Sequence, residues 1–228
     1  MLRSNHNSLE IATYGIPDAA KYLHVHTNTL RYWTTGTRSS PPVINIADPE
    51  TPLLSFMDLV ECWVLAGLRH RHRLPMQSIR RAVETLRDHH GSEHPLAERD
   101  FQTDGVDLFI EIASQPVNLS RRDQYGLREI VQAYLRRIDR DVEGIANRLY
   151  PFTRKAQLGV GTELPRVVVI DPTVSFGRPV LYGTGISTAF LNARVRGGDR
   201  PEALAREYGC GLSDIEEAIR FEKGKQAA

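Results

Sequence analysis

The segment that most constrains this chain is residues 167–187, VVVIDPTVSFGRPVLYGTGIS. An apolar run over 167–170 predicts a short strand that stops at Asp171-Pro172, and Gly177, Gly183 and Gly185 predict turns behind it. Three short helical patterns follow, and two of them predict a helix-turn-helix. Their expected bounds are 186–195, ended by Gly197-Gly198; 202–208, opened by Pro201 and stopped by Gly209; and 214–223, with Ser213 and Glu216 as a capping box. We expect one small core between these helices, made of Leu204, Ala205, Leu212, Ile215, Ala218 and Ile219.

A second and unrelated helix-turn-helix pattern lies near the other end, over residues 16–33. Pro17 opens a short helix to residue 23, residues 24–26 make a tight turn, and Thr27 is the expected N-cap of a helix over 28–35 that Gly36 ends. The apolar residues between the two helices are Ala19, Ala20, Leu23, Val25, Leu30 and Trp33. A chain with such a module at each end is more typical of a regulator than of an enzyme.

Between these modules the periodicity predicts mixed structure. Residues 43–46 are a candidate strand in a Pro- and Ser-rich segment, and apolar patterns predict helices over 55–71 and 76–90. Alternation in 101–103 and 106–112 around Asp104-Gly105 predicts a β-hairpin. A helix from the Ser120 cap to about residue 138 and a strand over 145–152 should follow, and residues 153–165 are expected to form a linker.

Composition sets the class of protein. The chain has 228 residues, enough for one large domain or two to three small ones, and its formal net charge is +1, so any basic patch must be local. Cys62 and Cys210 are far apart and suggest no disulfide framework. The N-terminus has no signal-peptide pattern and no apolar run would span a membrane, so a cytoplasmic protein is expected.

The N-terminal module has the residues that DNA reading needs. Helix-turn-helix recognition requires polar side chains on the first turns of the second helix. The candidates are Thr27, Asn28, Thr29, Arg31 and Tyr32, with Arg38 in the following wing reaching a phosphate. Asn can read adenine, and Arg can read guanine or bind phosphate. The alternative is a helical hairpin without a nucleic-acid partner.

Catalytic and metal chemistry are not predicted. Gly183-Thr184-Gly185 lacks the Lys-Ser/Thr of a phosphate-binding loop, and no catalytic residue set stands out. His89, His90 and His94 lie near one another, but without a matching set of Cys or carboxylate neighbours they predict a solvated loop rather than zinc. No cofactor and no metal are therefore expected.

The N-terminal pattern IPDAAKYLHVHTNTLRYWTTG resembles the start of a MerR-type winged helix-turn-helix. The resemblance covers about residues 14–90, including the two helices after the wing. It implies that Arg31 and Tyr32 contact the DNA backbone while Thr27, Asn28 and Thr29 face the groove.

The C-terminal segment, about 166–222, resembles an antitoxin domain long catalogued as of unknown function. Its motifs here are Asp171-Pro172, Gly177-Arg178-Pro179-Val180 and Gly183-Thr184-Gly185-Ile186, with Gly185 where that pattern has Arg. The two modules in this order resemble the larger VapB-type antitoxins, which are encoded beside a PIN-like ribonuclease toxin. An antitoxin Arg could occupy the acidic metal site of such a nuclease. The candidates are Arg121, Arg122, Arg136, Arg137 and Arg178, although solvated helix faces also explain most of them.

These observations together predict a mostly helical α+β protein in three parts. Residues 13–95 should form the MerR-like winged helix-turn-helix, 96–155 a small α+β connection, and 166–223 a trihelical domain with short strands. The expected function is that of an antitoxin that neutralises a PIN-like ribonuclease and binds the promoter of its own operon, as a homodimer or higher oligomer and without a membrane. The alternatives are a MerR-type one-component regulator that senses a small effector and an excisionase-like DNA-binding protein.

Overall fold

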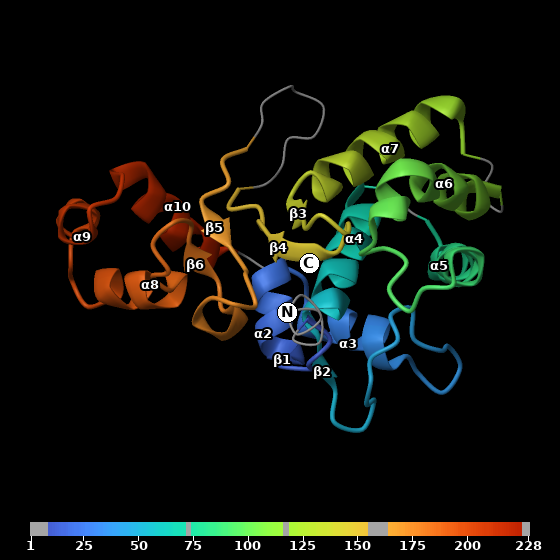
Figure 1. Ribbon diagram of the computed structural model, residues 1–228, viewed down its shortest axis with the longest axis horizontal. Coiled ribbons are helices and arrows are strands. Elements are labelled where there is room, and N and C mark those ends of the chain that lie inside the picture. The colour runs from blue at the N-terminus through green and yellow to red at the C-terminus, as the bar shows by residue number, and fades with distance from the viewer. Residues whose placement is uncertain (1–8, 72–73, 116–118, 155–163, 225–228) are drawn as a thin grey trace. The chain divides into compact units, whose positions relative to one another are not determined.

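The computed structural model describes residues 9–71, 74–115, 119–154 and 164–224 (Figure 1). Within them the chain is mostly helical with small two-stranded sheets, which confirms the α+β class. The chain divides into two compact units, residues 1–147 and 148–226. In the part of the chain described, no helix is both long and apolar enough to cross a membrane.

The first unit begins with the predicted helix pair. The first elements of this unit are β1 (Tyr14–Gly15), α2 (Ile16–Leu23), α3 (Thr27–Thr35) and β2 (Leu53–Leu54). Strands β1 and β2 pair antiparallel. The core expected between α2 and α3 is confirmed for all of its members except Val25, which is only half-buried. The cap of α3 is His26 rather than Thr27, since its Nδ1 accepts the Asn28 backbone N–H at 3.2 Å. The strand expected over 43–46 is wrong, because the N–H groups of Val43 and Ile44 both donate to the Trp33 carbonyl at the end of α3 instead of pairing with a strand.

Helix α4 (Phe56–Arg71) is the centre of the first unit, and α5 (Met76–His90) follows it as predicted. Ser55 and Asp58 cap α4 reciprocally, with each backbone N–H donating to the other's side chain. A Cβ at Gly67 would lie 2.6 Å from the Tyr134 ring, so glycine is what lets α7 (Arg121–Leu135) pack closely on α4. The Trp63 indole N–H donates to the Tyr134 carbonyl at 3.0 Å in the same contact.

The predicted hairpin after α5 is wrong. Residues Phe101–Gly105 form a π-helical turn, η1, that continues into α6 (Val106–Ser114). Val106, Phe109, Ile110 and Ala113 are buried, and their spacing of three, four and seven is helical. Because α6 packs on both α5 and α7, tertiary burial of this stripe prevails over the local alternation (Figure 1). Helix α7 begins at the predicted Ser120 cap but ends at Leu135, where β3 (Ile138–Arg140) starts soon after.

The predicted strand over 145–152 is confirmed as β4 (Ala146–Leu149), which pairs with β3. The predicted linker at 153–165 lies mostly outside the described residues. The second unit contains β5 (Val168–Val169) antiparallel to β6 (Val180–Leu181), then α8 (Thr188–Arg196), α9 (Pro201–Tyr208) and α10 (Leu212–Lys223). The prediction that Ser213 and Glu216 form a capping box for α10 is wrong. Gly211 is the N-cap, and no side chain makes a capping hydrogen bond there.

The core of the second unit matches the predicted set with one exception. Leu204, Ala205, Ile215, Ala218 and Ile219 pack with Leu181 and Leu191 in one cluster. Leu212 lies at the first position of α10 and is 37% exposed, so it does not belong to that core. The second unit is thus three short helices closed against a small hairpin, as the turn residues indicated.

Candidate functional site

Helix α3 presents one polar face and buries the other. Leu30, Trp33 and Thr34 are buried, whereas Asn28, Thr29 and Arg31 are exposed and Thr27 and Tyr32 are half-buried. No acidic residue stands in the first turn, so the positive end of the helix dipole has no carboxylate of its own helix beside it. The predicted DNA-reading residues therefore lie on one helical face, in the arrangement that a recognition helix requires.

The turn after α3 carries Arg38 at its tip. Thr37 and Ser40 exchange backbone hydrogen bonds of 2.7 and 3.3 Å, which leaves Arg38 and Ser39 as the two turn residues. Gly36 has φ of +65°, and a Cβ there would lie 2.5 Å from the Ser40 carbonyl oxygen. The turn thus requires glycine at position 36, and it holds exposed Arg38 a few residues beyond the end of α3.

Tyr32 is linked to α5. The Arg80 Nη2 donates to the Tyr32 hydroxyl at 3.5 Å, although the two residues are far apart in sequence. The hydrogen bond from Arg80 is the main reason that the pKa of Tyr32 lies below its usual value, with a further hydrogen bond from Ser40 and the charges of Arg80 and Arg69 acting in the same direction. Arg80 of α5 and Arg69 of α4 therefore place positive charge near the Tyr32 hydroxyl, a feature that the sequence reading missed.

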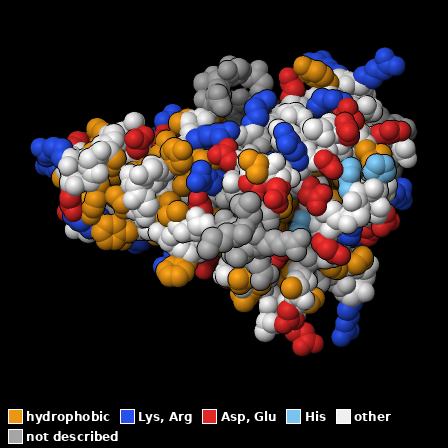
Figure 2. All heavy atoms as spheres, viewed as in Figure 1, with side chains coloured by type: hydrophobic (Ala, Val, Ile, Leu, Met, Phe, Trp, Pro, Cys, Tyr) orange, Lys and Arg blue, Asp and Glu red, His pale blue; other side chains and the backbone are white. Residues whose placement is uncertain are grey.

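The four predicted toxin-binding arginines of the first unit do not lie together on one surface. Arg121 and Arg122 begin α7, whereas Arg136 and Arg137 follow its end, and a helix of this length separates the two pairs by about 22 Å. Arg137 is buried, while Arg121, Arg122, Arg136 and Arg178 are exposed. On the face shown in Figure 2, basic and acidic side chains are interspersed without a continuous basic field.

A strained loop in the second unit holds Phe176 in solvent. Ser175, Phe176 and Gly177 have φ of 49°, 57° and 71°, and Phe176 is 93% exposed. Left-handed backbone at a non-glycine residue costs about 1–2 kcal/mol. Asp171 anchors the start of the loop, where its Oδ1 accepts the Thr173 N–H at 2.9 Å and its Oδ2 accepts from Arg148 at 2.8 Å. The loop therefore exposes an aromatic ring two positions before exposed Arg178 in the sequence.

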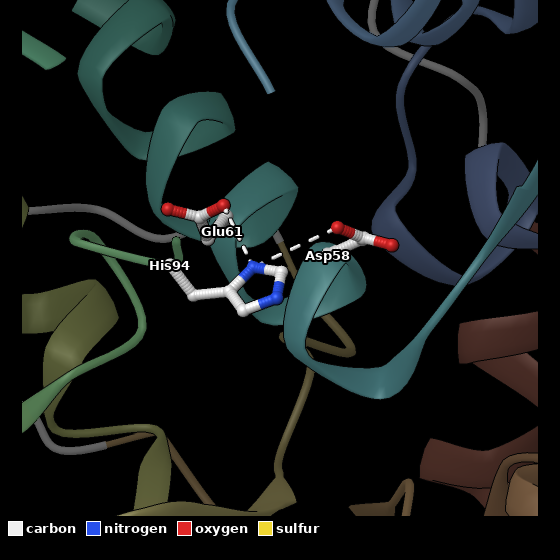
Figure 3. Close-up of side chains that lie close together, drawn as sticks. All are labelled: Asp58, Glu61 and His94. Atoms are coloured by element: carbon white, nitrogen blue, oxygen red, sulfur yellow. Dashed lines mark hydrogen bonds and ion pairs between the residues drawn. The ribbon is translucent and has the colours of Figure 1, made fainter. Parts of the chain in front are cut away.

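Two carboxylates and a histidine meet in the first unit (Figure 3). Asp58 and Glu61 lie one helical turn apart on α4, and His94 comes from the loop after α5. The His94 Nδ1 lies 3.3 Å from the Glu61 Oε2 and 3.7 Å from the Asp58 Oδ1. The His94 Nε2 lies 3.0 Å from the Glu10 Oε2.

This cluster corrects the prediction of a solvated histidine loop. The His94 side chain is 13% exposed, and two of its three carboxylate neighbours lie on α4, where Glu61 is 33 positions earlier in the chain. Burial raises the pKa of Asp58 to about 6. Burial lowers the pKa of His94, but the Glu61 hydrogen bond and the charges of Glu61, Glu10 and Asp58 outweigh it and raise that pKa to about 9.

Comparison with known proteins identifies a matching family model and proteins of similar sequence. Residues 168–221 match the model of a family described as a protein of unknown function, DUF433. The chain is 29% identical to a Mycobacterium tuberculosis protein named "Putative antitoxin VapB45", over 92% of this chain and 93% of that one. It is 26% identical to "Uncharacterized protein Rv2308" of the same organism, over 94% and 92% of the two chains.

A solved structure is similar along almost the whole chain. The crystal structure of Rv2018 from Mycobacterium tuberculosis has a TM-score of 0.71 and 27% identity, covering 92% of this chain and 98% of that one. The MerR-like module receives no support from these relatives and stays a prediction. The match to VapB45 extends over both units, and it supports an antitoxin-like protein.

Proposed function

We propose that this chain is an antitoxin of a type II toxin–antitoxin system, which binds and neutralises a PIN-like ribonuclease and represses its own operon through α3. The observation that carries the proposal is the similarity to a protein named as an antitoxin over 92% of the chain. Because that similarity includes both units, it favours one protein with two binding surfaces over a lone DNA-binding module.

The first unit supplies the DNA-binding surface in this proposal. The exposed polar face of α3 would enter the major groove, with Asn28 and Thr29 at base edges and Arg31 at a phosphate. Arg38 at the tip of the turn would contact a neighbouring phosphate. Because a helix-turn-helix usually reads two half-sites, the DNA-bound form should be a dimer or a higher oligomer.

The second unit supplies the toxin-binding surface. Phe176 is exposed on a strained loop and Arg178 is exposed next to it. Aromatic residues and Arg are the types that contribute most to protein interfaces. An acidic metal site of a nuclease is a chemically matched partner for the Arg178 guanidinium.

Coexpression with the nuclease encoded next to this chain tests the proposal. The full-length chain should restore growth and copurify with the nuclease, and the complex should bind the DNA upstream of the operon. Full-length point variants suit this test better than a fragment ending near Gly91, because such a fragment would remove α7 from the Gly67 surface of α4. If the full-length chain neither restores growth nor copurifies, the effector-sensing regulator becomes the better assignment.

A further inference from the structure

The cluster of Asp58, Glu61 and His94 (Figure 3) has Glu10 beside it, and it contains more negative charge than its own groups neutralise. Glu10, Asp58 and Glu61 all lie within 4 Å of the one imidazole of His94. Glu10 is 54% exposed, but Asp58 and Glu61 are buried, and even a protonated imidazole would balance only one of these two. Buried charge without a counter-charge is strongly unfavourable, so a cation would complete this site.

Each carboxylate is oriented so that one oxygen faces the histidine. Asp58 Oδ2 accepts the Ser55 N–H at 2.8 Å and Glu61 Oε1 accepts the Leu96 N–H at 3.0 Å. Their other oxygens, Asp58 Oδ1 and Glu61 Oε2, face His94 Nδ1. Outer hydrogen bonds that fix the free oxygen of a carboxylate are typical of metal ligands.

Asp58 provides an independent sign of a missing ligand. The residue is 3% exposed, and its Oδ1 has no hydrogen-bond partner among the described residues. This buried oxygen points into the cluster and stays 3.7 Å from His94 Nδ1, beyond hydrogen-bond distance. A reciprocal cap with Ser55 accounts for Oδ2, whereas Oδ1 has only the 3.7 Å ion pair with His94 and accepts no hydrogen bond from the described residues.

The spacing suits a small divalent cation. The three ligand atoms lie within 4.8 Å of one another. Ligands of tetrahedral zinc, at about 2.0–2.1 Å from the metal, lie about 3.3 Å apart, close to the 3.3 and 3.7 Å found around His94 Nδ1. Imidazole nitrogen disfavours Ca²⁺ and Mg²⁺ and favours transition metals. The contact of Nε2 with Glu10 would form the carboxylate–histidine–metal triad that orients a ligating ring.

We propose that Asp58, Glu61 and His94 Nδ1 bind a divalent transition-metal ion, with Glu10 holding the His94 ring from outside. The bound ion joins α4 to the loop after α5, and through Glu10 it also joins the segment before β1. This site goes beyond the proposed antitoxin function and does not depend on it.

Titration of the untagged full-length chain, freed of metal with a chelator, with Zn²⁺ and separately with Mn²⁺ tests the proposal. Calorimetry should give one ion per chain for at least one of the two metals, and thermal unfolding should shift upward with that ion. His94→Gln and Glu61→Gln should each abolish stoichiometric binding. Glu10→Gln should weaken binding about 10–100-fold, the range found for outer-shell partners. Because Glu10 is 54% exposed, that variant is expected to fold even if a ligand variant does not.

His89→Gln is the matched control, because His89 is an exposed histidine near the same loop. It should bind the ion as the parent chain does. With Co²⁺ as the probe, visible absorption bands of a bound ion should be present in the parent and in His89→Gln and absent in His94→Gln. The proposal is overturned if neither Zn²⁺ nor Mn²⁺ binds saturably, or if stoichiometric binding survives in His94→Gln.

Discussion

The Arg80 guanidinium in α5 lies 3.5 Å from the Tyr32 hydroxyl in α3. Tyr32 faces the polar side of the predicted recognition helix, whereas Arg80 is 8% exposed and belongs to the helix that packs on α6. The contact links the predicted DNA-reading surface to the interior of the first unit, and it places positive charge beside any phosphate that the Tyr32 hydroxyl would bind.

Tyr32→Phe should weaken binding to the operon's upstream DNA by about tenfold or more, since a hydrogen bond to a charged group such as a phosphate contributes about 1.5–3 kcal/mol. The substitution keeps the ring and removes only the hydroxyl, so thermal unfolding should change little. Fluorescence anisotropy with labelled DNA measures the effect. Tyr125→Phe is the control, because Tyr125 is 62% exposed on α7 and should bind like the parent. Equal affinities of the two variants would remove Tyr32 from the DNA surface.

Substitutions of Arg31 and Asn28 should distinguish a contact with the DNA backbone from the reading of bases. Arg31→Ala should weaken binding to specific and unrelated DNA alike and reduce the slope of log affinity against log salt by about one, because one phosphate contact is lost. Asn28→Ala should leave that slope unchanged and relax the preference for one base pair. The measurement is a salt titration on operator and scrambled DNA. If both variants keep the parent's slope and preference, α3 is not the reading helix.

The sequence predicted most of the helices because their boundaries are marked by local chemistry. Gly36, Gly91 and Gly209 end helices with positive φ, and Pro17 and Pro201 stand in first turns. Local pattern failed at 101–112, where alternation and helical spacing fit the same residues. Only the packing of α6 between α5 and α7 decides between them.

The candidate sites show the same division. The polar face of α3 is a property of nine consecutive residues, and it could be predicted. The Asp58–Glu61–His94 cluster could not, because His94 reaches α4 only through the folding of the chain between them. The i, i+3 spacing of Asp58 and Glu61 on an apolar helix was the one local signal. Both carboxylates are buried there, so they require hydrogen-bond donors or a cation from parts of the chain that are distant in sequence, here the Leu96 N–H and His94.

The second unit should become less stable at acidic pH because the Glu217 carboxylate loses its charge. It is 2% exposed and accepts hydrogen bonds from Thr153, Arg154 and Arg220. Burial raises the pKa of Glu217, but these hydrogen bonds, led by that of Arg154, outweigh it and leave the pKa lowered. A carboxyl with a lowered folded pKa stabilises the fold above its unfolded pKa of about 4.3 and loses that contribution as the pH falls through the folded value.

Glu217→Gln should therefore destabilise the chain at pH 7 by about 1–2 kcal/mol, less than for a fully buried pair because Arg154 and Arg220 are half exposed. The difference from the parent should shrink below about pH 4. Urea unfolding at several pH values measures it. Glu216→Gln, at an exposed neighbouring position, should change stability by less than about 0.5 kcal/mol. A pH-independent loss in Glu217→Gln would show that packing, not charge, explains the effect.

Replacing Phe176 with glycine should stabilise the fold and weaken toxin binding. Glycine adopts positive φ without strain, so Phe176→Gly should raise the free energy of unfolding by up to about 1 kcal/mol, while a 93% exposed ring loses almost no burial. If the ring is a toxin contact, the same variant should weaken the complex by about 2 kcal/mol or more, roughly thirtyfold. Val142→Gly is the control: Val142 is 95% exposed without positive φ, so glycine there should slightly destabilise the chain and leave toxin affinity unchanged. Denaturant unfolding and calorimetry with the purified nuclease measure the two quantities. A Phe176→Gly chain that is more stable and still binds the nuclease as tightly as the parent would place the toxin surface elsewhere.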